Sequence, residues 1–158
     1  MSTIYSEQLF SRNAAIFRPF LARAGLSENI LEQPDIEVPI EAYIDLLEMV
    51  ARESEPSIGL IMGETTQAGD LGDYGLAMAA TPNAGECLRI MAQYLYVFAQ
   101  MNTIRVDQAS DWTVVSYRYH GPEPFGAIHD TEFAIVAILT ILRGLTGQHI
   151  VPRYAEFA

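Results

Sequence analysis

Apolar residues recur at three- and four-residue spacings through the first third of the chain, and this pattern predicts a series of helices. One stripe predicts an amphipathic helix over residues 6–24 that Gly25 ends, and Ser27 is a suitable cap for a short helix over 27–33. Pro39 suits the start of a third helix, where an amide proton would have no partner. The buried stripe expected of this third helix comprises Ile40, Tyr43, Ile44, Leu47 and Val50.

The middle of the chain alternates short apolar runs with glycine-bearing polar segments. Residues 56–62 predict a short helix that the following glycine ends, and residues 64–73 predict a polar loop. Residues 74–80 fit either a helix or a strand. A helix over 82–98 is better marked, because Thr81 can cap it and a proline occupies its first position. Its expected buried face comprises Cys87, Leu88, Met91, Leu95 and Phe98.

Two later stretches alternate in the manner of strands and predict a β-hairpin. Residues 103–106 and 112–120 are the expected strands, and the segment QASD between them has the composition of a turn. Alternate side chains of the second strand should point to opposite faces. One set comprises Thr113, Val115, Tyr117 and Tyr119, and the other comprises Trp112, Val114, Ser116 and Arg118. Apolar groups in both sets favour a central place in the sheet.

The last long helix is expected over residues 130–145, with Gly147 ending it. Its apolar residues surround the axis almost completely, so it must be buried or must face a partner. Residues 151–157 predict the start of another strand. The expected fold class is α+β, with a helical N-terminal third followed by an antiparallel sheet packed against two long helices. A length of 158 residues suits one domain over 1–158 with a substantial core.

Charge and cysteine content narrow the function classes. The net charge is −11 and all nine basic residues are scattered arginines, which argues against nucleic-acid binding by this segment itself. A single cysteine fits a reducing, cytoplasmic setting. The start of the chain has no signal-peptide pattern. The longest apolar run, residues 133–142, is about half of the ~20 residues that span a bilayer, so a soluble protein without a membrane partner is expected.

Few residues suggest catalysis or metal binding. His129 and Glu132 have the spacing of a shared helix face but lack a third ligand, and Glu132 is more simply an acid near a helix N-terminus. Cys87 falls on an apolar helix face, where a thiol acts as a small hydrophobe. The glycines of GDLGDYG lack the phosphate-loop spacing and suit a tight turn and close packing. No enzyme and no cofactor are expected, although His120 or His129 would be the ligand if haem were bound.

Aromatic residues are the best candidates for binding a small molecule. Tyrosine rings with hydroxyl groups are typical of ligand pockets, although core packing explains each of them equally well. Arg105 and Arg118 lie on paired strands and are candidates to hold a carboxylate, with surface exposure as the simpler alternative. The candidate ligand-binding set is Tyr74, Tyr94, Trp112, Tyr117, Tyr119, Arg118 and His129.

Three blocks of sequence resemble one known family. They read RAGLSENILEQPDIEVPIEAYIDLLEMVARESEPSIGLIMGE, GDLGDYGLAMAATPNAGECLRIMAQYL and EFAIVAILTILRGLTGQHIVPRYAEF. Over residues 21–157 the chain resembles the N-terminal effector domain of AraC-type transcription regulators, in the arabinose-binding-like branch that includes regulators of ornithine and arginine catabolism. The resemblance implies a sensor domain joined to C-terminal helix-turn-helix motifs that bind DNA. This segment lacks those motifs, and no strict motif transfers effector residues.

The sequence therefore predicts a regulatory domain that senses a small metabolite of unknown identity. DNA would be contacted only through the missing C-terminal domain, and a homodimer is possible. Two parts are expected to change arrangement on binding: the loop over 64–73 and the apolar helix after Asp130. The alternative is a dimerisation module without a ligand, with its contact on the side of that helix that carries Ile135, Ile138 and Leu142.

Overall fold

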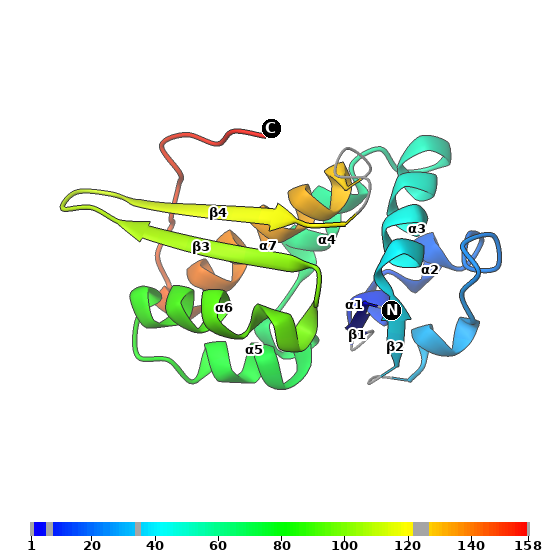
Figure 1. Ribbon diagram of the computed structural model, residues 1–158, viewed down its shortest axis with the longest axis horizontal. Coiled ribbons are helices and arrows are strands. Elements are labelled where there is room, and N and C mark those ends of the chain that lie inside the picture. Colours follow the sequence, from blue (N-terminus) through cyan, green and yellow to red (C-terminus); the bar gives the residue numbers. More distant parts are fainter. Residues whose placement is uncertain (1, 6–7, 34–35, 122–126, 158) are drawn as a thin grey trace.

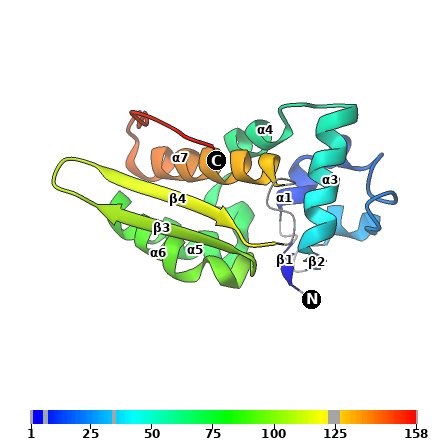
Figure 2. The ribbon, with the colours of Figure 1, turned by 45° about the horizontal axis from the view of Figure 1, so that its top comes forward.

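The computed structural model describes residues 2–5, 8–33, 36–121 and 127–157 of the chain. Figure 1 shows the N-terminal helical segments at one end of the molecule and a long β-hairpin at the other. In both views the last long helix runs alongside the hairpin (Figure 1, Figure 2). The architecture is α+β, as predicted.

The N-terminal segment is more broken than its apolar stripe predicts. Helices α1 (Leu9–Arg12) and α2 (Ala14–Phe17) replace the single helix expected over 6–24, whose first residues lie outside the described part. Asn13 separates them, and its side-chain amide donates to the Leu9 carbonyl, a local bond that competes with the helical pattern. Pro19 then has no amide proton with which to continue a helix.

Two three-residue strands flank this segment and were missed from the sequence. Strands β1 (Thr3–Tyr5) and β2 (Glu37–Pro39) pair antiparallel, and three residues are too few to show an alternating pattern. The short helix after Ser27 is confirmed as a 3-10 helix, Glu28–Leu31, and the Ser27 hydroxyl accepts from the Asn29 amide. Helix α3 (Ile40–Glu53) begins directly after Pro39, as predicted. Its predicted stripe is buried: Ile40, Tyr43, Ile44, Leu47 and Val50.

Helix α4 (Ile58–Thr65) runs through Gly63, so the predicted end at that glycine is wrong. The glycine serves close packing against helix α7 (Ile128–Thr146) instead. A Cβ atom at Gly63 would lie 2.6 Å from the Val136 Cβ, and one at Gly59 would lie 2.2 Å from the His129 carbonyl oxygen. Two glycines one helical turn apart therefore let the backbones of α4 and α7 approach.

The segment expected to be a loop over 64–73 is largely ordered structure. It contains a 3-10 helix, Ala68–Leu71, and leads into helix α5 (Gly72–Ala79), which settles the ambiguous segment as a helix. Gly72 has φ of 58° and ψ of −143°, a conformation that favours glycine, so the turn role predicted for this glycine-rich motif is confirmed.

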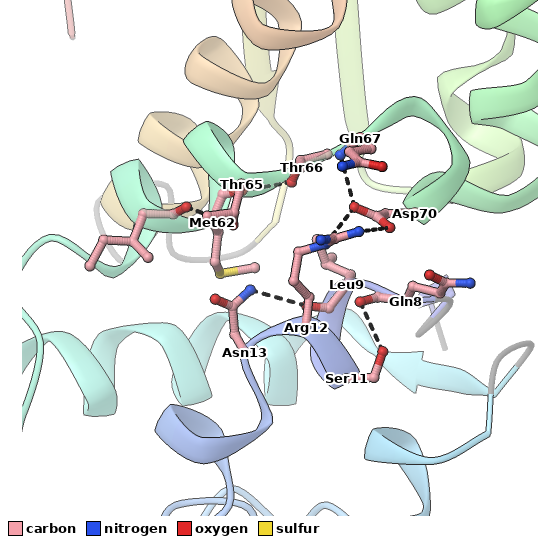
Figure 3. A network of polar contacts seen from close by, with 11 residues as sticks. Gln8, Leu9, Ser11, Arg12, Asn13, Met62, Thr65, Thr66, Gln67 and Asp70 are labelled. Carbon is pink, nitrogen blue, oxygen red and sulfur yellow. Dashed lines mark hydrogen bonds and ion pairs between the residues drawn. The ribbon is translucent and has the colours of Figure 1, made fainter.

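Asp70 ties that segment to the N-terminal helices (Figure 3). Its carboxylate accepts from the Arg12 guanidinium at 2.7 and 2.6 Å and from the Gln67 amide at 2.8 Å. Asp70 is buried whereas the Arg12 side chain is one-third exposed, with a relative accessible area of 34%. The polar GDLG segment therefore fixes residues that are 58 positions apart in sequence.

Helix α6 (Ala84–Phe98) begins two residues later than predicted. Asn83 caps it by accepting from the Glu86 amide at 2.9 Å, whereas the Thr81 hydroxyl donates back to the Met78 carbonyl at 2.7 Å. Thr81 therefore closes the preceding turn and does not cap this helix. The predicted apolar face is confirmed, since Cys87, Leu88, Met91, Leu95 and Phe98 are all buried.

Strands β3 (Asn102–Gln108) and β4 (Thr113–Tyr119) form the expected antiparallel hairpin. The alternation is confirmed, because Val115, Tyr117 and Tyr119 are at least half-buried while Arg118 is exposed. The central position predicted for the second strand is wrong: within the described residues β4 pairs only with β3. Trp112 and Val114 explain the misleading pattern, because both are exposed near the hairpin turn.

Helix α7 is buried on several sides, against α3, α4, α6 and β4, which satisfies its all-round apolar surface. Gly147 ends it with φ of 64°, as predicted. Ile138 and Leu142 are buried within the domain, so the side of the helix proposed as a dimer contact is not exposed. Residues 151–157 form no strand in the described structure and are exposed, which corrects that prediction.

We expect Gly63→Ala to lower the free energy of unfolding by about 1–3 kcal/mol, because the added methyl group must displace Val136 or separate α4 from α7. Gly144→Ala is the matched control. A Cβ there meets none of the described atoms within 4 Å, and alanine favours the helix by up to ~1 kcal/mol. Urea denaturation measures both variants. Equal stability of Gly63→Ala and the parent protein would contradict the close packing.

Candidate functional site

An apolar cavity lies between the hairpin and helices α5, α6 and α7. The space open to the centres of water-sized spheres is about 50 Å³, several times the ~10–15 Å³ that one water needs. Residues that line it include Met78, Met91 and Phe98 on one side and Phe133, Ala134 and Ile138 on the other. A small or slender molecule is therefore the guest that this volume suits.

Polar groups gather at one end of the cavity. Asp130 lies in the first turn of α7 and is 1% exposed, and the Tyr117 hydroxyl of β4 donates to its carboxylate at 2.6 Å. Asn102, at the start of β3, is also buried, and its Oδ1 has no hydrogen-bond partner among the described residues. The buried Tyr43 hydroxyl of α3 lies close enough to Asp130 to feel its charge, although among the described residues it forms no hydrogen bond of good geometry. We call Asp130, Tyr117, Asn102 and Tyr43 the polar end.

Burial governs the acid–base behaviour of this polar end. Desolvation raises the pKa of Asp130 from 3.8 to about 6, and hydrogen bonding from Tyr117 only partly opposes this. The pKa of Tyr117 and that of Tyr43 are both well above the ordinary value, first through burial and then through the neighbouring Asp130 charge. The positive end of the α7 dipole favours the ionised carboxylate but carries only partial charge.

No cationic side chain compensates Asp130. The chain has no lysine, and all nine arginines lie in the described part. Five arginines have other partners: Arg12 with Asp70, Arg18 with Glu28, Arg23 with Glu53, Arg89 with Glu86, and Arg143 with the Ile150 carbonyl. The other four, Arg52, Arg105, Arg118 and Arg153, are exposed. A buried carboxylate without a counter-charge is therefore the distinguishing chemical feature of the cavity.

Two of the candidate ligand-binding residues line the cavity, Tyr74 and Tyr117. The Tyr74 ring stacks on Phe98 and its hydroxyl donates to the Met91 carbonyl at 3.0 Å, so this group is already satisfied. Tyr119 is buried on the same strand face as Tyr117 but does not line the cavity. Tyr94, Trp112 and Arg118 are exposed and lie apart from the cavity.

His129 points into a different cluster, with Glu48 of α3 and Glu132 of its own helix. Its Nδ1 lies 3.7 Å from a Glu48 oxygen and 4.0 Å from a Glu132 oxygen. Among the described residues no three His, Cys, Asp or Glu side chains are grouped to hold a metal ion. Cys87 is buried, and burial raises the pKa of its thiol, which disfavours the nucleophilic thiolate.

Asp130 and Asn102 were missed from the sequence. The helix-dipole role assigned to Glu132 belongs to Asp130, because α7 begins at Ile128 and Asp130 is the acid of its first turn. The available signal was an acid at the edge of a helix that is apolar all round. Asn102 carries no such signal, since only the hairpin register brings it opposite Tyr119 and near the helix.

The structure is that of an α+β domain with an apolar cavity between its hairpin and helices. A sequence model of the family described as the arabinose-binding domain of AraC transcription regulators, N-terminal, matches residues 17–158. The chain belongs to this family. No curated protein sequence matches it. Within the described residues, no helix is both long enough and apolar enough to cross a bilayer.

The raised pKa of Asp130 predicts a pH-dependent stability. The folded state holds a proton that the unfolded state releases, so stability falls as pH rises from about 4 through about 6. Relative to Asp130→Asn, the parent protein should lose about 1 kcal/mol of unfolding free energy between about pH 5 and pH 7. The neighbours facing this carboxyl, Tyr43, Tyr117 and Tyr119, stay protonated throughout, because the pKa of each is raised above 10.0.

Urea denaturation of both proteins across this pH range measures the difference. Using the difference between the two proteins cancels the titration of the surface carboxylates, which both share. A difference that is constant with pH, or that grows as pH rises, would contradict a raised pKa at Asp130.

Proposed function

We propose that this domain senses a small metabolite in a transcription regulator, by binding it in the cavity between the hairpin and α7. The single observation that carries the proposal is the apolar cavity with incompletely satisfied polar groups at one end. A few polar groups in an otherwise apolar pocket are typical of small-molecule sites. Membership of a family of regulator domains supports the same function.

Binding can act on the rest of a regulator through the walls of the cavity. Leu71 lines the cavity and follows Asp70, which Arg12 holds, while Ile4 of β1 contributes to the same lining. A guest that shifts Leu71 therefore acts on the N-terminal segment as well. The segment over 64–73 and helix α7 remain our proposed moving parts, and an effector changes their arrangement only by binding one arrangement more tightly.

In this proposal, ligand binding changes DNA binding by a helix-turn-helix domain of a longer regulator, as expected for this family. We expect such a regulator to act in the cytoplasm and to catalyse no reaction. A dimer is part of this proposal. Its contact is not the buried Ile138 side of α7, but exposed apolar residues elsewhere offer two other patches. One is Tyr96 and Val97 near the end of α6, and the other is Trp112 and Val114 near the hairpin turn. The rival function, dimerisation without a ligand, rests on these patches alone.

Filling the cavity tests ligand sensing. Ala134 lines the cavity, so Ala134→Leu should abolish binding of any guest by occupying its space. Thermal-shift and calorimetric titrations would use L-arabinose, arginine, ornithine, and short straight-chain amines, alcohols and carboxylic acids. We expect at least one class to raise the melting temperature of the parent protein by mass action.

Ala77→Leu is the matched control, because Ala77 lies on the exposed face of α5 next to the cavity-lining Met78. It should leave binding unchanged. Absence of binding by every class, or binding that Ala134→Leu does not weaken, would contradict a sensing role for this cavity.

A further inference from the structure

We propose that the cavity selects a small, slender molecule with an amine head and an otherwise apolar body, with the ammonium group held by Asp130 and the Asn102 amide oxygen. The inference rests on the proposed sensing function and names the chemical class of its ligand. Among the described residues, two features of the polar end carry it: the hydrogen-bonding groups that lack partners, and the absence of a positively charged side chain beside Asp130.

The free groups at the cavity wall are acceptors. Asn102 Oδ1 is buried and unpaired within the described residues, and the Asp130 carboxylate, which accepts a hydrogen bond from Tyr117, lines the same cavity. Tyr74 and Tyr117 line the same space, but both hydroxyls already donate elsewhere. A head group that donates hydrogen bonds therefore fits, and an ammonium group has three donors and no acceptor.

Charge separates an amine from an alcohol. Every arginine of the chain is exposed or has another partner, so no side chain supplies a positive charge to Asp130. The folded protein has already removed this carboxylate from water, and an ammonium ion adds a charge-assisted hydrogen bond to it. An alcohol would satisfy the same acceptors without relieving the buried charge.

The uncompensated charge and the apolar walls disfavour two other classes of ligand, carboxylic acids and sugars. A carboxylic acid would place a second negative charge beside Asp130 with no arginine to receive it. A sugar needs partners for several hydroxyl groups, whereas Ile4, Leu71 and Ile141 are typical of the walls. The apolar walls instead suit a hydrocarbon body, and Met78 and Met91 can adjust to its length.

Three probes with five carbon atoms each test the head group: pentylamine, pentan-1-ol and pentanoic acid. Propylamine and heptylamine vary the length, and L-arabinose is the sugar. NMR titration at about pH 7.5, where Asp130 is mostly ionised, measures each dissociation constant. We expect the best amine to bind at least about tenfold more tightly than the matched alcohol or acid. Its affinity should fall below about pH 6, as Asp130 takes up a proton.

Two variants separate the ligand class from the existence of the site. Asp130→Asn should lose most of the amine preference, because the amide keeps an acceptor oxygen for an alcohol but not the charge that favours an ammonium group. Ala134→Leu should remove all binding. Equal or tighter binding of pentanoic acid, pentan-1-ol or arabinose, lost in Ala134→Leu, overturns the amine class and leaves the sensing function standing. An amine preference that survives in a folded Asp130→Asn variant also overturns it. Absence of binding by every probe overturns both proposals.

Discussion

The buried carboxyl group of Asp130 is the constraint around which the interior of this domain is arranged. It brings together the first turn of α7, Tyr117 of β4 and Tyr43 of α3, three elements that are separate in sequence. The shift of its pKa from 3.8 to about 6 corresponds to about 3 kcal/mol that disfavours the ionised form. An apolar residue there would avoid this penalty. Ligand recognition at this position, as we propose, would give the retained carboxyl group a role that offsets this penalty.

The walls around Asp130 differ in how firmly they are held. On one side, Gly59 and Gly63 let α4 lie directly against α7, and interlocked backbones of this kind resist small displacements. On the other side, Leu71 belongs to a short helical segment that the Arg12–Asp70 ion pair and local hydrogen bonds hold. The hairpin is held on one face and carries exposed apolar groups near its turn. In the motion that we propose, residues 64–73 and the neighbouring hairpin are therefore expected to shift further than α7 does.

Local periodicity was sufficient to predict most of the fold. The stripe of α3, the apolar face of α6 and the hairpin alternation each depend on neighbouring residues, and all three are confirmed. The errors arose where a distant contact decides the local structure. Sequence alone indicates a helix end at Gly63, whereas in the structure this glycine allows α7 to pack against α4. The short strands β1 and β2 depend on pairing with each other across a long stretch of chain, as Ile4 does with Val38.

The candidate site was harder to predict, because a cavity belongs to no single segment. Tyr74 and Tyr117 were chosen from residue type alone and line the cavity, whereas Trp112 was chosen on the same grounds and is exposed. Asp130 and Asn102 depend on burial, which sequence periodicity does not reveal for polar residues.

In the sensing function that we propose, the small volume of the cavity would link ligand recognition to signalling. A guest larger than the open space must displace Met78, Met91 or a wall of the cavity, so part of its binding free energy depends on wall position. That dependence is the differential affinity between two arrangements that linkage requires of an effector. A roomy, fully formed pocket would bind its ligand without needing either wall to move. A tight cavity with Asp130 at one end and the flexible side chains of Met78 and Met91 in its wall would instead convert the length of the guest into displacement of the walls. On this argument the anchor determines which head group enters, and the apolar body determines how far the walls separate.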